Sequence, residues 1–338
     1  MAKSARFIGW LAAAFVGYLA IGWLSMQLVF APQNIAVVWP LSGFFLSALI
    51  LAKPTQRKFL VPLLFLADFC VEIYGGSNFV LSAIYAACLS AEAMFSWWVL
   101  NKLFGEQFRF STLRQTISFL VLVVMLSNAL ATSGAMLGAN LILDDPFWDG
   151  WLSWWSSSAV GNLLMTPLIL SWAQFSNKKK EPGFNRAILE ITGMSIAVFA
   201  SVYLAFTVVD FEFTGLENPL SEALYVLSFP VLIWAAIRHG IKGSAVASFS
   251  LAASVFALSI NATHVDGITV LELSNILKTQ VFVAVICSTS LILAVVITEK
   301  GQSDKLKISA LEETAEANKT KRLLQHHRSL FSCKQVSC

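Results

Sequence analysis

The stretch from Phe7 to Ala52 contains no charged residue and no histidine, and this absence restricts most strongly how the chain can fold. A soluble domain of this size needs charged side chains to cover its surface, and about 25% of the residues in such domains are charged. Here charged residues make up 13% of the 338 residues, and hydrophobic residues make up 57%. The composition therefore predicts a protein of the lipid bilayer, built as an all-α bundle of transmembrane helices.

Further apolar runs follow along the whole chain. A helix needs about 20 predominantly apolar residues to cross the hydrocarbon core of a bilayer. We predict membrane segments at residues 7–30, 35–52, 59–74, 79–100, 115–139, 151–175, 187–209, 222–237, 244–260 and 278–298. The second, third, eighth and ninth segments are short for a full span, so eight full spans are an alternative to ten.

The lysine and arginine residues are distributed unevenly between the two sides of these segments. If the N-terminus is cytoplasmic, all of the 23 lysines and arginines except Lys278 fall on the cytoplasmic side. Outer loops such as "APQN", "GGSN" and "NLILDDPFWDG" contain none. Because positive residues accumulate on the cytoplasmic side of membranes, we predict that both termini are cytoplasmic.

The composition changes after Thr298, where a charged, proline-free sequence rich in helix-forming residues begins. We predict an integral membrane domain over residues 1–298, a cytoplasmic helical stem over 299–325 and a disordered tail over 326–338.

A weak coiled-coil pattern lies within this stem. Ile308, Leu311, Ala315 and Asn318 follow the alternating spacing of three and four residues that a coiled-coil seam requires. The pattern favours a homodimer joined through residues 300–322, but a single solvated helix also accounts for it.

Three acidic residues fall inside or close to apolar segments. Asp68 and Glu72 are four residues apart, so they share one face of a helix and could hold a cation or a proton. Glu72 is about one turn from the outer end of its segment, so it could also be solvated. Glu92 is deeper, and no lysine or arginine lies in the middle of a segment to pair with it. We therefore expect a protonated carboxyl or a neutral polar partner at Glu92.

The sequence "WWSSSAVGNLLMTP" places further polar residues inside a membrane segment. Ser158 and Asn162 share a helix face and are candidates for ligand contact, although small polar residues also serve as packing contacts between membrane helices. Pro167 withholds one backbone donor from the same helix. Together with Pro40 and Pro230, it is compatible with the discontinuous helices found in transporters.

Signatures of catalysis and metal binding are missing from the sequence. The four histidines match no metal-ligand spacing, and no nucleophile elbow, metalloprotease motif or phosphate-binding loop is found. We therefore predict no metal, no cofactor, no nucleic-acid partner and no enzymatic activity in this chain.

Four stretches in order resemble a known family. The stretches "VVWPLSGFFLSALIL", "SAEAMFSWWVLNKLF", "WWSSSAVGNLLMTPLILSW" and "FPVLIWAAIRHGIKGSAVA" are similar to the bacterial membrane-associated sensor domain, type one, of the MASE group. The resemblance covers roughly residues 7 to 300. The positions that match its motifs are Trp39, Pro40, Ser42, Gly43, Glu92, Gly161, Pro167, Pro230 and Gly240. Where the family often carries an acid in the sixth segment, this chain has Ser158.

The resemblance implies a sensory role in the bacterial inner membrane. Domains of this family are input modules for cytoplasmic histidine kinases, diguanylate cyclases or phosphodiesterases. The stretch "ALEETAEANKTK" is similar to the helix that precedes the phosphoacceptor box of hybrid sensor kinases, yet no such box follows. This mismatch suggests a truncated or frame-shifted sensor kinase.

Two functions are therefore open from the sequence. The first is a membrane sensory module that relays an unknown signal through its last helix to a cytoplasmic output. The alternative is a secondary transporter of a small solute or cation, which the intramembrane acids and prolines would suit.

Overall fold

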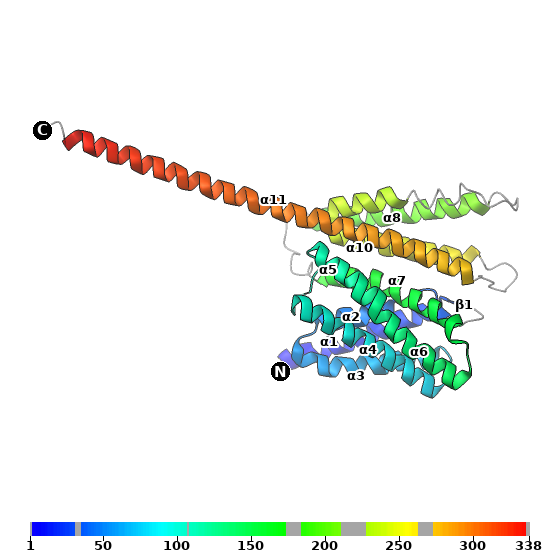
Figure 1. Cartoon of the computed structure of the whole chain (residues 1–338). Helices are drawn as coiled ribbons and strands as arrows, with labels where there is room; N and C mark the ends of the chain where they lie inside the picture. The colour runs from blue at the N-terminus through cyan, green and yellow to red at the C-terminus, as the bar shows by residue number, and fades with distance from the viewer. Residues whose placement is uncertain are drawn as a thin grey trace.

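The structure is a computed structural model that describes residues 2–30, 35–106, 108–173, 184–210, 228–262 and 273–335. It is a bundle of helices, which confirms the predicted all-α class (Figure 1). The elements of its first half are α1 (Ala2–Met26), β1 (Val29–Phe30), β2 (Ile35–Ala36), α2 (Pro40–Leu51), α3 (Pro54–Tyr74), α4 (Phe79–Phe104), α5 (Leu113–Ser118), the π-helix η1 (Phe119–Ser127) and α6 (Asn128–Leu143). Its second half contains α7 (Phe147–Ala173), α8 (Phe184–Asp210), α10 (Ser228–Ala262) and α11 (Leu273–Gln335).

Five of the described helical stretches are long and apolar enough to cross a membrane. They are Phe7–Met26, Phe79–Phe104, Leu113–Leu143, Ser228–Ala257 and Ile276–Lys321. This number is lower than the eight to ten spans expected from the sequence. One reason is that α2 has only 12 residues. Another is that serines and an asparagine lower the hydropathy of α7, although these side chains are buried in the bundle.

The eighth and ninth predicted segments form the two arms of α10. Between them, Gly240 has φ 61° and ψ −142°, a backbone conformation that only glycine adopts without strain. The motif position Gly240 therefore lies at the kink between the two arms of α10. Pro230 lies in the first turn of α10, and α7 continues through Pro167, so neither proline interrupts a helix.

The second predicted segment is shorter than expected. We predicted a membrane segment from residue 35, but β1 and β2 pair as a short antiparallel ladder and helix α2 begins at Pro40. A residue before proline is disfavoured in the helical region, which keeps Trp39 outside the helix at φ −116° and ψ 78°, and Pro40 is well suited to the first helical position.

Helix α2 lies at the centre of the bundle and is buried on all sides. Phe45 and Leu49 belong to a hydrophobic core shared with α1, α3 and α4. Leu46 and Ile50 belong to a second core shared with α7, α8, α10 and α11. A helix in this position has no face in water, which explains why its sequence is apolar all round.

Both chain termini lie toward one end of the bundle in Figure 1. We call this end the stem end and the opposite end the far end. Helix α11 starts at the far end, crosses the bundle and continues outward as a long single helix (Figure 1). Its residues 301–321 are all exposed.

The expected boundary near residue 298 is therefore a change in burial within one helix. The helix also extends to Gln335, where we expected a disordered tail from residue 326. The sequence after Gly301 contains neither proline nor glycine that would end the helix.

Candidate functional site

The two acids of α3 lie on the same buried face but have different partners. Asp68 is 1% exposed and accepts a hydrogen bond of 2.8 Å from the hydroxyl of Tyr18 in α1. Glu72, one turn closer to the far end, is 6% exposed and accepts a long hydrogen bond of 3.4 Å from the Ser77 hydroxyl. Glu72 is therefore largely enclosed by the bundle rather than exposed on its surface.

Glu92 of α4 is paired with Asn162 of α7. The Asn162 side-chain amide donates a hydrogen bond of 2.6 Å to the Glu92 carboxyl, and both side chains are buried. This contact confirms the expectation of a neutral polar partner at Glu92. The Ser127 hydroxyl donates to the backbone carbonyl of Glu92 at 3.2 Å, which ties η1 to the same point of α4.

Two polar atoms beside this pair have no hydrogen-bond partner among the described residues. They are the side-chain carbonyl oxygen of Asn162 and the hydroxyl of Ser158, which lies one turn away on α7 and is 1% exposed. Buried polar groups are usually hydrogen-bonded, so such exceptions call for an explanation.

Helices α2 and α7 approach each other at two glycines. A Cβ atom on Gly161 would lie 1.9 Å from the backbone oxygen of Trp39, and one on Gly43 would lie 2.7 Å from the backbone oxygen of Gly161. The predicted motif residues Trp39, just before α2, and Pro40 and Gly43 of α2 thus face Gly161 of α7. Ser42 is also buried in this region.

The extended backbone before α2 is held by hydrogen bonds from α7. The backbone amide of Trp39 donates to the Ser157 carbonyl at 3.1 Å, and the Ser157 hydroxyl donates to the Ala36 carbonyl at 2.6 Å. Extended backbone inside a bundle needs such partners because no helical ladder satisfies it.

Helix α11 reaches the same segment through Gln280. Its side-chain amide donates to the Val37 carbonyl at 2.6 Å, and its side-chain oxygen accepts from the Ser156 hydroxyl at 2.7 Å. Gln280 is 1% exposed, so both bonds are shielded from solvent. The last helix is thereby linked to the segment that precedes α2 and to α7.

At the stem end, α11 is linked to α5. The Glu299 carboxylate accepts a hydrogen bond of 2.8 Å from the backbone amide of Leu113, the first residue of α5. A carboxylate is stabilised at a helix N-terminus, where backbone amides are unpaired and the helix dipole is positive. Close by along α11, the Thr298 hydroxyl lies 3.0 Å from where a Cβ atom on Gly240 would be.

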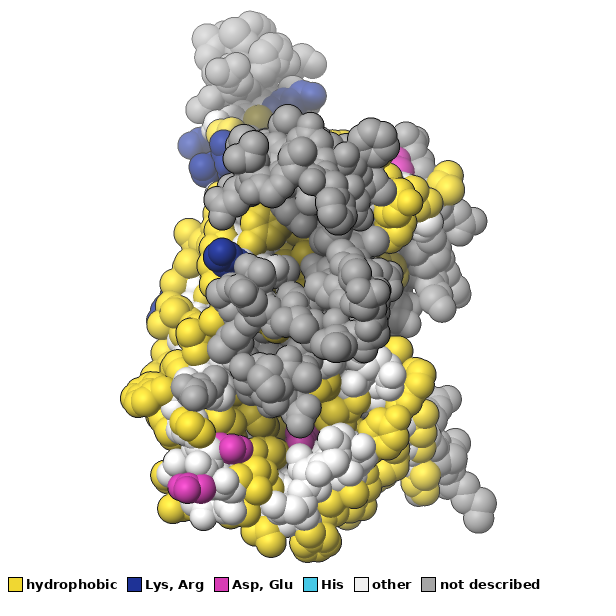
Figure 2. All heavy atoms as spheres, turned by 90° about the vertical axis from the view of Figure 1, so that its right-hand side faces the viewer, with side chains coloured by type: hydrophobic (Ala, Val, Ile, Leu, Met, Phe, Trp, Pro, Cys, Tyr) yellow, Lys and Arg dark blue, Asp and Glu magenta, His cyan; other side chains and the backbone are white. Residues whose placement is uncertain are grey.

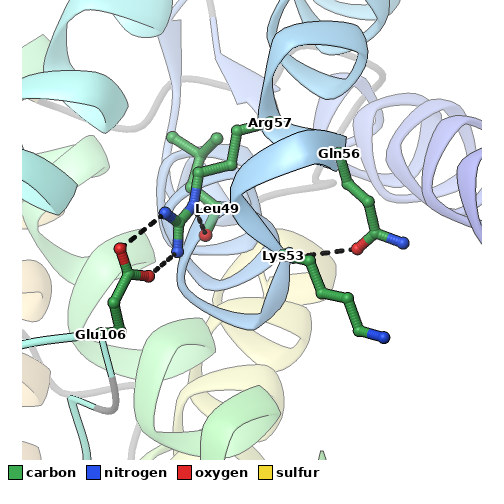
Figure 3. Close-up of polar contacts among 5 residues, drawn as sticks. All are labelled: Leu49, Lys53, Gln56, Arg57 and Glu106. Carbon is green, nitrogen blue, oxygen red and sulfur yellow. Dashed lines mark hydrogen bonds and ion pairs between the residues drawn. The ribbon is translucent and has the colours of Figure 1, made fainter.

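Arg57 joins three elements at the stem end (Figure 3). It forms an ion pair with Glu106 through two hydrogen bonds of 2.5 and 3.2 Å, and it donates to the Leu49 carbonyl at 3.1 Å. Its guanidinium also lies 4.4 Å from the ring centroid of Trp97. The hydrogen bond from Arg57 holds the pKa of the Glu106 carboxyl below its usual value.

The far end of the bundle contains a cavity of about 820 Å³. Its walls come from α3, α4, α6 and α7 and from the segment before α2. Glu72 and Ser158, both predicted as candidate ligand residues, line it together. Asp68, Glu92 and Asn162 are not among its lining residues.

Several residues of this network were not predicted from the sequence. They are Tyr18, Gln280, Ser156, Ser157 and Glu299. A lone amide in an apolar run is a signal that could have identified Gln280, whereas the partners of the others depend on how distant helices pack.

These observations define a helical membrane protein with buried polar groups between its helices, some of which are hydrogen-bonded to the helix that leaves the bundle. Residues 9–301 match the MASE1 family, a family of membrane-associated sensor domains, and the chain therefore belongs to that family. The resemblance seen in the sequence is thus confirmed. No curated protein and no solved structure matches the chain.

Proposed function

We propose that this membrane sensor domain relays its signal through α11 to a cytoplasmic output, a histidine kinase or a cyclic-di-GMP enzyme, at the bacterial inner membrane. The observation that carries the proposal is the double role of α11. Gln280 of this helix is hydrogen-bonded inside the bundle, while residues 301–321 of the same helix leave the bundle and are exposed.

A relay requires two arrangements of the bundle with different affinities for the stimulus. Displacement of the segment before α2, or of Ser156 on α7, would break the hydrogen bonds of Gln280. Because α11 is one uninterrupted helix from Leu273 to Gln335, a shift near its start would move its exposed part. The bond between Glu299 and Leu113 is a second contact that such a shift would change.

The stimulus would act on the buried polar groups described above. We propose Asp68, Glu72, Glu92, Ser158 and Asn162 as the candidate sensing residues. Their burial supports this role, since polar groups inside a membrane are costly and often functional.

The relay can be tested by fusing the chain through residue 320 to a diguanylate cyclase and measuring basal product formation in cells. We expect Gln280→Leu to change the output by about fivefold, since a hydrogen-bonding difference of about 1 kcal/mol shifts a two-state equilibrium by roughly that factor. Thr289→Val is the matched control, because Thr289 is an exposed polar residue of the same helix.

Unchanged output from Gln280→Leu, at equal amounts of protein in the membrane, would contradict the relay. Substrate-dependent flux in liposomes, combined with an output that no variant alters, would instead support the transporter alternative.

A further inference from the structure

The far-end cavity is large enough for a small organic molecule and reaches the protein surface. Its volume of about 820 Å³ lies within the usual range of ligand pockets, roughly 300–1,000 Å³. Glu72 and Ser158 are buried in its wall, while Asn78 and Asp145 at its rim are exposed. Figure 2 views this end of the molecule and shows acidic side chains among hydrophobic and uncharged ones in its lower part.

The described lining of the cavity contains two acidic side chains. Glu72 and Asp145 line it, and no lysine, arginine or histidine is found among the described residues of its lining. The ion pairs found in the described part of the chain do not involve Glu72 either. A buried carboxylate without a cationic partner is unfavourable, so a cation that entered the cavity would be bound favourably beside it.

Aromatic rings form the other part of the wall. Trp39, Tyr85 and Trp154 all line the cavity, and the rings of Tyr85 and Trp154 lie 4.5 Å apart between centroids. Faces of tryptophan and tyrosine rings attract ammonium groups, and aromatic cages are a common way to bind quaternary ammonium ions.

A hydroxyl group in the wall has no protein partner among the described residues. The Ser158 hydroxyl is 1% exposed and lines the cavity. A ligand in the cavity could supply the hydrogen bond that this buried group lacks.

We propose that the far-end cavity binds a small organic ammonium ion, held by the Glu72 carboxylate, by the rings of Trp39, Tyr85 and Trp154, and by the Ser158 hydroxyl. The proposal deepens the proposed sensory function and rests on it for the consequence of binding. Trp39 and the neighbouring Ser157 also line the cavity, and they belong to the segment and helix that Gln280 contacts.

Binding can be measured on the full chain in lipid nanodiscs by titrating choline chloride or propylammonium chloride at constant ionic strength and following tryptophan emission. We expect saturable binding of at least one ammonium ion. The neutral isostere of choline, in which a tert-butyl group replaces the trimethylammonium group, should bind at least about tenfold more weakly, which corresponds to about 1.4 kcal/mol.

Substitutions can distinguish ammonium binding in the cavity from attraction by acidic residues elsewhere on the surface. We expect Glu72→Gln to weaken ammonium binding about tenfold and Glu72→Asp to restore part of it. Asp144→Asn is the matched control, because Asp144 neighbours Asp145 but does not line the cavity, and asparagine tolerates its φ of 60°. This control should leave the affinity unchanged.

Three outcomes would overturn the ammonium site. They are the absence of saturable binding by both ammonium ions, equal binding of the neutral isostere, and equal affinity of folded Glu72→Gln and wild-type protein. Thermal unfolding of each variant establishes that it is folded. The binding assay contains no output domain. A failed relay in the fusion experiment would therefore not contradict ammonium binding, and a failure to bind ammonium would not contradict the relay.

Discussion

The buried polar residues of the bundle are paired mainly by neutral groups rather than by salt bridges. Glu92 accepts a hydrogen bond from the side-chain amide of Asn162, and Asp68 accepts one from the phenol hydroxyl of Tyr18. In each pair the two residues lie on different helices. In a low-dielectric interior such contacts are strong, and an unpaired polar group is correspondingly costly. Each pair therefore fixes how two helices pack.

At the residue scale, we predict that Glu92→Leu destabilises the bundle by about 1–3 kcal/mol, because it leaves the Asn162 amide buried without its acceptor. Glu92→Gln keeps a side-chain oxygen that accepts the same hydrogen bond, so it should cost clearly less. Thermal unfolding of both variants in the same detergent measures the difference. Equal stability of the two variants would show that the contact with Asn162 contributes little.

At the scale of elements, the contact between α2 and α7 depends on close approach of backbones. Gly43 and Gly161 permit this approach, and the bonds between Trp39, Ala36 and Ser157 align the extended segment with α7. Small residues commonly serve this purpose in membrane proteins, where interhelical packing rather than burial from water drives association. The close approach of the two backbones by itself requires glycine at both positions.

We predict that Gly161→Ala destabilises the protein by at least about 3 kcal/mol, since a methyl group 1.9 Å from the Trp39 oxygen requires a shift of backbone. Gly193→Ala in α8 is the matched control. No atom lies within 4 Å of its added Cβ, so this change should be neutral or stabilise by up to about 1 kcal/mol. Thermal unfolding and the amount of folded protein in membranes check both variants. A fully stable Gly161→Ala protein would contradict the observed packing.

At the scale of the whole molecule, α11 connects the far end of the bundle to a helical stretch, residues 301–321, whose side chains are all exposed. Leu306, Ile308 and Leu311 are 71%, 55% and 68% exposed. Apolar side chains on an isolated helix favour a partner helix, and we propose that the stem of a second copy supplies it.

The dimer can be tested by cysteine crosslinking of the full chain after its five native cysteines are replaced by serine. We expect Ile308→Cys, Leu311→Cys and Ala315→Cys to crosslink efficiently. Glu313→Cys, on the opposite side of the helix from Leu311, should crosslink poorly. Crosslinking without helical periodicity would argue against a paired stem.

The sequence by itself determined the class of the protein, its family and the presence of a continuous polar stem. These features depend on local composition, because a long apolar run has few stable solutions other than a helix in lipid. It also identified Glu92 as a residue that needs a neutral polar partner or a proton, and Gly240 as a motif position. The sequence identified Pro40 and Gly43 as motif positions, but it did not predict which residues of other helices contact them.

The tertiary structure alone decided which distant residues meet. The pairing of Glu92 with Asn162, the contact of Gln280 with Val37, and the meeting of Glu72 and Ser158 at one cavity join residues far apart in the chain. Local periodicity contains no information about such contacts. They depend on which helices pack side by side and on how far these helices are shifted along their axes. The same applies to α2, which the sequence predicted only as a short membrane segment and which lies at the centre of the bundle because other helices enclose it.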